Sequence, residues 1–304
     1  MVNFRYHLVS LIAVFLALGT GVVLGAGPLQ NAINMRGEDK GSLSATELSG
    51  NLEEMSLQVT QGEEFVWAVA DDLLPGALEG VSVAVVALPG TTSSDKGTIA
   101  RGLELAGADV AGQVDLTSRW VGVSDATYRQ TLAAAVSTHL QGEPSDTSAA
   151  GILAQGFIEI LTTDGTEADL IREMLTDEST ALVVGTSLPT TPVEAVVLVG
   201  PSQVQESEEN AQSGQENDSE GASESWLELA LAATSAPGGA VAVGQAQFED
   251  QFIAALRTSD ARITTVDQGG TAMSAVNTAL ALASGELGAY GQQLGAVEPL
   301  APRP

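Results

Sequence analysis

Four short apolar runs of the chain end in a glycine beside small or polar residues, an arrangement that could form a ligand crevice. They are Leu88-Pro89-Gly90-Thr91, Val184-Gly185-Thr186-Ser187, Val199-Gly200-Pro201-Ser202 and Val243-Gly244-Gln245. In a doubly wound sheet such glycines meet at the carboxyl edge, where ligands bind, and Gly90 to Ser94 could hold an anion at a helix start. Neither G-x-G-x-x-G nor G-x-x-x-x-G-K-[ST] is present, and glycines after strands are mostly turn residues. We therefore predict no cofactor, and a small-ligand sensor is our third hypothesis.

The residues that catalysis or metal binding would need are few and scattered. The chain has no cysteine and no G-x-S-x-G sequence, and its two histidines are His7 and His139. The five methionines are far apart, at Met1, Met35, Met55, Met174 and Met273. Acidic pairs such as Glu53-Glu54 are typical of the solvated face of a helix. The sequence thus predicts no catalytic residue, no metal ligand and no enzyme.

The charge balance is strongly acidic. Of 304 residues, 39 are Asp or Glu and 11 are Lys or Arg, which gives a net charge of −28 and a pI near 4.1. No basic residue lies between Arg172 and Arg257. Because neutralisation of phosphates by Lys and Arg supplies most nucleic-acid affinity, this composition excludes nucleic acid as a partner.

The elements that would position these residues begin with an uncharged run of nineteen residues, Leu8 to Ala26. A helix of this length covers about 28 Å, close to the ~30 Å hydrocarbon core of a bilayer. A cleaved signal peptide is the alternative, although its apolar region is usually only ~7–15 residues long. Because Arg5 and the amino terminus precede the run, we expect a single-pass span in the cytoplasmic membrane with the amino terminus inside and the carboxyl-terminal domain outside.

One face of the predicted span carries only small residues. Ala13, Ala17, Gly21 and Gly25 recur at every fourth position, and the last two have the GxxxG spacing that lets helix backbones approach closely. Small residues are also common in membrane helices, so chance spacing is the alternative. We predict that this face mediates self-association.

A second dimerisation signal follows. Ser44-Ala45-Thr46-Glu47 matches a capping box that begins a helix, and Pro75-Gly76 ends it. Apolar residues within this helix have heptad spacing: Leu48, Leu52, Met55, Val59, Val66, Val69 and Leu73. They predict the seam of a parallel two-stranded coiled coil, with Gly62 as its weak point. The alternative is a single amphipathic helix packed on the following domain.

From residue 81 onward, β-rich runs alternate with alanine-rich helices. The predicted strands are Val81–Leu88, Asp109–Val114, Ala181–Val184, Ala195–Val199, Ala240–Val243 and Arg262–Val266. The predicted helices are Lys96–Ala106, Asp125–Leu140, Ala149–Thr162, Glu167–Leu175, Trp226–Ala233, Gln245–Arg257 and Thr271–Ser284. This alternation indicates an α/β fold with a mostly parallel, Rossmann-like sheet that has helices on both faces.

An acidic segment interrupts the predicted α/β domain. Residues 203–225 hold seven acidic and no basic residues and lack an apolar period, which predicts a disordered insertion. A calcium loop is the alternative, but the D-x-D-x-D-G framework is missing. The predicted parts are a cytoplasmic tail (1–7), the span (8–26), a connector (27–43), the coiled coil (44–75), the α/β domain (80–292) and a flexible tail (293–304).

Both ends of the chain resemble a known family. Phe4 to Gly25, FRYHLVSLIAVFLALGTGVVLG, looks like the amino terminus of the actinobacterial MctB family, which is named for a mycobacterial copper transport protein. Gly285 to Gly291, GELGAYG, resembles the glycine-tyrosine ending of that family. The resemblance implies copper export or an outer-membrane channel. One branch resembles SteB, a cell-envelope protein linked with a membrane partner, SteA, to cell division and control of peptidoglycan hydrolysis.

We interpret the sequence first as a non-enzymatic, SteB-like envelope protein. It would dimerise through its span and coiled coil and present the α/β domain to an envelope or division partner similar to SteA. Copper transport or homeostasis is the second interpretation, because copper(I) prefers cysteine and clustered methionine or histidine, which this sequence does not assemble.

Overall fold

The computed structural model describes residues 45–142, 147–202, 216–259 and 261–304. The chain divides into two units, residues 1–59 and 60–304, and the long helix α3, Ala45–Leu73, contributes to both. The predicted span, its small-residue face (Ala13, Ala17, Gly21 and Gly25) and the connector lie outside the described residues. Within the described ranges, no helix is long and apolar enough to cross a membrane.

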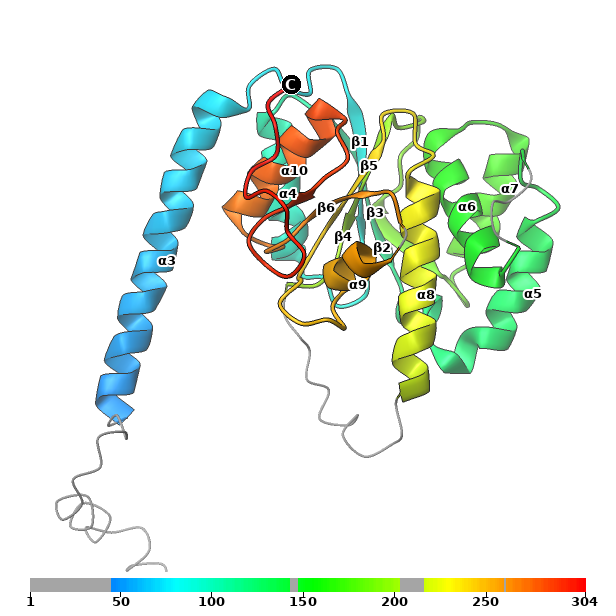
Figure 1. The fold of residues 1–304 in the computed structure, drawn as a ribbon. Helices are drawn as coiled ribbons and strands as arrows, with labels where there is room; N and C mark the ends of the chain where they lie inside the picture. The colour runs from blue at the N-terminus through cyan, green and yellow to red at the C-terminus, as the bar shows by residue number, and fades with distance from the viewer. Residues whose placement is uncertain (1–44, 143–146, 203–215, 260) are drawn as a thin grey trace, which may run out of the picture. The chain divides into compact units, whose positions relative to one another are not determined.

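The described residues of the second unit form a seven-stranded sheet with the order β3-β2-β1-β4-β5-β6-β7 (Figure 1). The strands are β1 Ser82–Ala87, β2 Asp109–Leu116, β3 Val183–Ser187, β4 Ala195–Val199, β5 Ala240–Val243, β6 Thr264–Val266 and β7 Ala289–Tyr290. Neighbouring strands are parallel except β3, which runs antiparallel to β2. Because β2 and β4 lie on opposite sides of β1, the sheet has the switch point of a doubly wound fold. The predicted mostly parallel sheet is confirmed.

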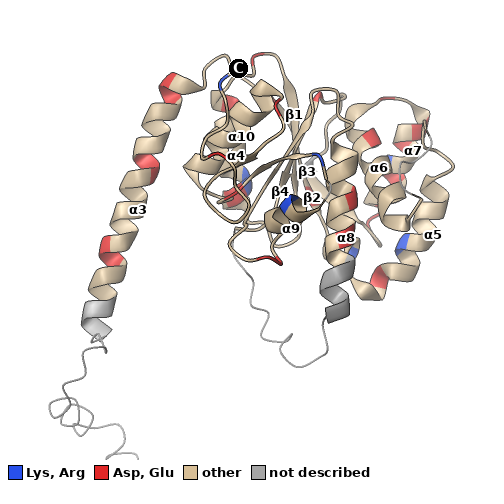
Figure 2. Cartoon of the chain, viewed as in Figure 1, with Lys and Arg blue, Asp and Glu red and all other residues tan. Residues whose placement is uncertain are grey.

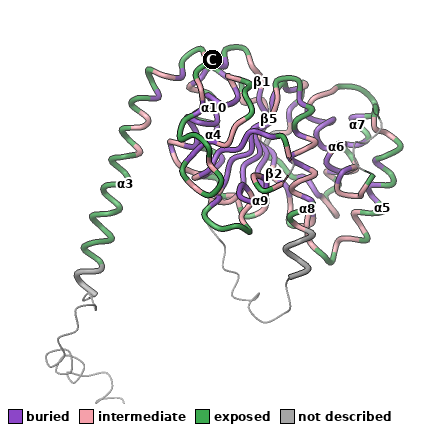
Figure 3. The backbone as a smooth tube through the Cα atoms, viewed as in Figure 1, coloured by how far each residue is buried: buried purple, intermediate pink, exposed green. Residues whose placement is uncertain are grey.

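Helices cover both faces of this sheet. They are α4 Ser93–Leu105, α5 Ala126–Val136, α6 Ala149–Thr162, α7 Thr166–Thr176, α8 Glu216–Ala233, α9 Phe252–Thr258 and α10 Ala272–Ser284, with 3-10 turns at Ser118–Trp120 and Val123–Asp125. Side chains alternate along each strand, so Val83 and Val85 of β1 face α4 and α10, whereas Ala84 and Val86 face the opposite cluster. Figure 3 shows the buried strands between the helices.

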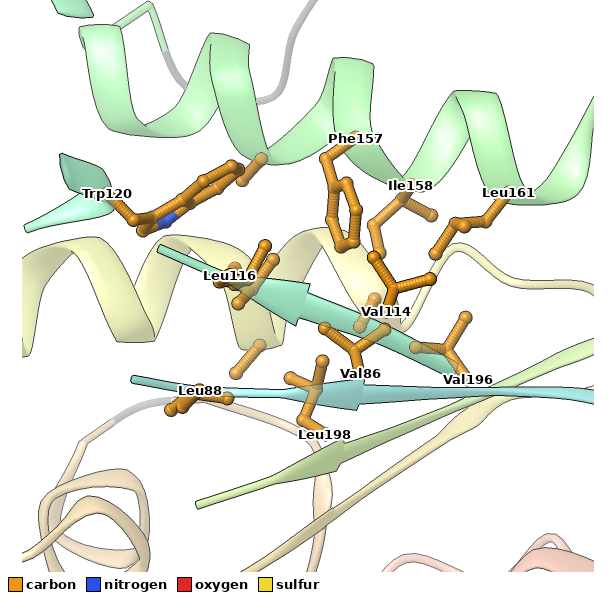
Figure 4. Packing of buried hydrophobic residues seen from close by; sticks show 14 of the residues in the cluster. Val86, Leu88, Val114, Leu116, Trp120, Phe157, Ile158, Leu161, Val196 and Leu198 are labelled. Atoms are coloured by element: carbon orange, nitrogen blue, oxygen red, sulfur yellow. The ribbon is translucent and has the colours of Figure 1, made fainter. Parts of the chain in front are cut away.

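The larger core cluster lies between the sheet and α6 (Figure 4). Phe157 of α6 is fully buried, and Trp120 meets it edge-on with ring centroids 5.6 Å apart. The second cluster, on the other face, begins at Ala70 and ends at Ala301. Both cores are therefore contained in residues 60–304, which we call the α/β body and treat as a unit that folds on its own.

The structure differs from the predictions at the starts of α8 and α9. Helix α8 begins at Glu216, so residues 216–225 are helical rather than disordered, because they extend a helix anchored by buried Leu229. Residues 203–215 lie outside the described ranges. Residues 245–251 are not helical, because the Gln251 side chain accepts the N–H groups of Gln247 and Phe248 and holds a turn before α9.

The carboxyl-terminal segment was predicted to be a flexible tail, and the structure contradicts this. Ala301 is 2% exposed and donates its N–H to Asn277 Oδ1, while Asn277 Nδ2 donates to the carbonyl of Pro299. The Val297 N–H also donates to the carbonyl of Ala289 in β7. One buried asparagine thus fixes a proline-rich segment that composition alone does not show to be ordered.

Candidate functional site

The first candidate site is the apolar stripe on the amino-terminal part of α3. Leu52, Met55 and Val59 are 59%, 62% and 64% exposed. Single exposed apolar residues are common, but three at heptad spacing on one helix are typical of a protein-contact face. The side chain of Leu48, the preceding seam position, lies outside the described side chains. We call Leu52, Met55 and Val59 the α3 stripe.

The seam residues after Gly62 have a different environment. Val66 and Leu73 are half-buried and pack against the core cluster that contains Ala70 and Leu74, whereas Val69 remains 45% exposed. The carboxyl-terminal part of α3 therefore matches the alternative of a helix packed on its own domain. The coiled-coil seam stays a prediction, and its exposed part is the α3 stripe.

Two contacts join the end of α3 to α10 and α4. The Ala272 N–H, in the first turn of α10, donates to Glu63 Oε2 at 2.6 Å. The guanidinium of Arg101 lies over the Trp67 ring, 4.0 Å from its centroid, as a cation–π contact. Glu63 and Trp67 were not predicted as contact residues, although they are four positions apart and so share a helix face outside the predicted seam.

We expect Glu63→Gln to lower the free energy of unfolding of the body by about 0.5–1.5 kcal/mol, because the neutral amide loses its attraction to the positive end of the α10 dipole. Urea unfolding measures the change. Glu64→Gln is the matched control, since Glu64 is exposed on the next helix position. Equal losses in the two variants would contradict a specific Glu63 contact.

The second candidate site is the carboxyl edge of the sheet, where the sequence placed a possible anion-binding turn. Thr91 Oγ1 donates to the carbonyl of Val199 at 2.8 Å, which joins the ends of β1 and β4. Asp95 and Thr92 form a capping box at the start of α4, with each side chain accepting the other's N–H at 3.1 Å. The carboxylate of Asp95 thus already occupies the helix start that could have held an anion.

The glycines at this edge allow backbones to pack closely. A Cβ on Gly269 would lie 2.8 Å from the Cα of Gly244, and one on Gly200 would lie 2.8 Å from the Phe252 ring. Gly185 does not join them, because it lies inside β3, which is antiparallel. These glycines are therefore explained by packing and not by a ligand.

Charged groups near this edge pair with each other. Lys96 Nζ lies 2.5 Å from Asp115 Oδ1. Arg257 Nη1 lies 2.9 Å from Asp267 Oδ2, and both side chains are almost fully buried. Throughout the described residues, every buried side-chain nitrogen or oxygen has a hydrogen-bond partner. These contacts give the small-ligand sensor hypothesis no support.

His139 belongs to an acidic cluster on the α5–α7 side. Its Nδ1 lies 2.6 Å from Glu167 Oε2 in α7. Burial raises the pKa of the nearby Glu159 carboxyl above its usual range; the Gln141 N–H, donated to both oxygens, lowers this pKa, and the charge of Glu167 raises it. Among the described residues, no group of three or more His, Asp or Glu side chains is placed to hold a metal ion.

The raised pKa of Glu159 predicts how the free energy of unfolding depends on pH. Because folding raises this pKa, the Glu159 carboxyl contributes to the free energy of unfolding at low pH. This contribution is fully present below the pKa of the unfolded chain and is lost as the pH rises through the pKa of the folded protein. The always neutral variant Glu159→Gln should therefore lose less unfolding free energy than the wild type as the pH rises from about 4 to about 8. Glu173→Gln, at an exposed position of α7, is the control. Parallel pH profiles for all three proteins would contradict the prediction.

These features define a doubly wound α/β protein whose strand-end edge is filled by its own side chains and whose long preceding helix carries an exposed apolar stripe. The family model described as "Copper transport outer membrane protein, MctB" matches residues 1–301, and the chain belongs to this family. The resemblance stated from the two ends of the sequence is thereby confirmed.

The similar curated proteins are named as copper transporters. The chain is 30% identical over 129 residues to proteins named "Copper transporter MctB" from Mycobacterium bovis and from two strains of Mycobacterium tuberculosis. The match covers 41% of this chain and 41% of each relative, so the chain aligns with less than half the length of the curated relatives. The comparisons support the copper interpretation, which the sequence analysis placed second, over the division role that it placed first.

Proposed function

We propose that the protein acts in copper transport or homeostasis at the cell envelope, as a non-enzymatic accessory protein. The observation that carries this proposal is the family match over residues 1–301. The relatives named as copper transporters support it over the aligned 41% of their length. Envelope attachment through the apolar run Leu8 to Ala26 belongs to the same proposal.

The composition suggests how the protein would act in copper transport or homeostasis. The chain contains no cysteine, so it cannot supply the thiolates that copper(I) prefers, and its methionines are far apart in sequence. We therefore propose that it works through contacts with proteins: a homodimer formed through the α3 stripe and the small-residue face of the span, and a separate envelope partner.

Copper sensitivity of a deletion strain tests the function. The strain is expected to grow less well than the wild type in copper-supplemented medium, and the wild-type gene should restore growth. Unchanged sensitivity would contradict the proposal. A Met55→Asp gene should restore growth less than Leu57→Asp if the α3 stripe is required, since Leu57 is 57% exposed but lies off the stripe.

Direct metal binding is measured separately. The full chain in detergent is titrated with copper(I) against a chromogenic chelator, and we expect no tight stoichiometric complex. A tight complex would overturn the accessory role but leave the copper function in place. The two experiments can therefore fail independently.

A further inference from the structure

A groove of about 400 Å³ lies between α8 and α9. Trp226 and Leu227 of α8 line it on one side, and Phe252, Ala255 and Leu256 of α9 line it on the other. Its lining is completed by Ser223, Glu224 and Ser259. The volume is within the range of sites that take apolar groups of a ligand or peptide. No strand-end glycine lines it, although the Phe252 ring packs against Gly200 at that edge.

Two helices of different length line the groove. Helix α8 has eighteen residues, but α9 has only seven. Trp226, Leu227 and Phe252 are half-buried: each packs against the larger core cluster and also lines the groove. Large apolar side chains held rigidly by a core, but left accessible in a concave surface, are typical of binding sites.

The groove lies in an acidic part of the chain, although Arg262, three positions after the lining residue Ser259, is basic and exposed. Between Arg172 and Arg257 the sequence has fourteen acidic and no basic residues. Arg257 is on α9, but its side chain is 4% exposed and paired with Asp267. Glu224 lines the groove, and exposed Glu249 and Asp250 lie three and two positions before the start of α9. Figure 2 shows acidic residues along α8.

We propose that this groove binds the apolar face of a cationic amphipathic helix from another protein. Its apolar side chains would enter between α8 and α9, and its Lys or Arg residues would face the acidic surroundings. A second copy of this chain does not fit this description. Its exposed apolar helix, α3, has seven acidic and no basic residues, so it would meet the groove with like charge.

A designed peptide tests the proposal. The probe is a labelled helix of about 14 residues, four turns, with leucine at the i, i+3, i+4 and i+7 positions and lysine elsewhere. Its binding to the α/β body is measured by fluorescence anisotropy. Two control peptides replace every lysine by glutamate or every leucine by serine. We expect only the leucine-lysine peptide to bind.

Ala255→Phe fills the groove without removing a core side chain, and Ala134→Phe adds the same ring at an exposed position of α5. We expect affinity to fall about tenfold or more in the first variant and to stay unchanged in the second. The triple variant Glu224→Gln, Glu249→Gln, Asp250→Asn should weaken binding at low salt and much less at high salt, because salt screens these charges. Thermal unfolding confirms that each variant is folded.

Three results would overturn the proposal. Equal binding to Ala255→Phe and Ala134→Phe would place the peptide elsewhere on this acidic protein. Equal binding of the glutamate peptide would remove the cationic requirement. Self-association of the body that Ala255→Phe abolishes would make a second copy the occupant.

Discussion

Replacing Asp267 by asparagine is expected to destabilise the α/β body by about 3–5 kcal/mol, the usual effect of breaking a buried ion pair. Asp267 is fully buried after β6, and its Oδ2 lies 2.9 Å from Arg257 Nη1. Its two oxygens also accept the N–H groups of Gln292 and Gln293 at 3.0 and 2.9 Å. The variant leaves the guanidinium buried without a counter-charge and turns an amide NH₂ toward groups that are themselves donors.

Urea unfolding of the body measures this loss. Asp250→Asn is the control, because it makes the same chemical change at an exposed position and should alter the free energy of unfolding by no more than about 0.5 kcal/mol. Arg257 also donates to the carbonyls of Tyr290 and Leu294, so the loss should include detachment of the segment after β7. A loss below about 1 kcal/mol for Asp267→Asn would mean that the pair contributes little.

The regular elements of the body could be predicted from the sequence because their signals are local. The bounds of Ala195–Val199 and Ala240–Val243 agree with β4 and β5, and Thr271–Ser284 agrees with α10 to within one residue. Continuous apolar runs of this length are buried on both faces of a parallel sheet. The short strand β7 was missed, since two residues are too few to show a period.

Features that depend on distant contacts could not be predicted. The antiparallel direction of β3 leaves Gly185 inside the strand, although its sequence looks like the other strand-end glycines. From the sequence alone, Asp267 and Arg257 cannot be distinguished from surface charges, because only the fold brings them together. The groove between α8 and α9 likewise depends on where α9 begins, which the side chain of Gln251 determines.

Helix α3 shows a further limit of what heptad periodicity can predict. A heptad pattern predicts a long apolar face, but it does not say whether a second copy or the chain's own domain covers that face. Val66 and Leu73 pack on the body, whereas Met55 and Val59 remain exposed. The change falls near Gly62, the residue that interrupts the heptad.

Met55→Asp is expected to weaken self-association of the chain from Ser44 onward by roughly 100-fold, because a carboxylate in an apolar seam raises the dimer free energy by about 3 kcal/mol. Sedimentation across a concentration series measures the dissociation constant. Leu57→Asp is the matched control: Leu57 is 57% exposed against 62% for Met55, but it lies outside the heptad positions. If the parent chain is monomeric, or both variants dissociate equally, the α3 stripe is not a dimer seam.

The effect of salt on binding distinguishes a second copy of the chain from a basic partner of the α3 stripe. Helix α3 has seven acidic and no basic residues, so two parallel copies repel each other. The polar residues that flank the stripe, Asn51, Ser56 and Gln58, are uncharged, so the repulsion comes from more distant carboxylates, which salt screens over about 10 Å at 0.1 M. Self-association should therefore strengthen as salt is raised. A partner that bound the stripe through basic residues would instead dissociate, because salt would weaken an attraction.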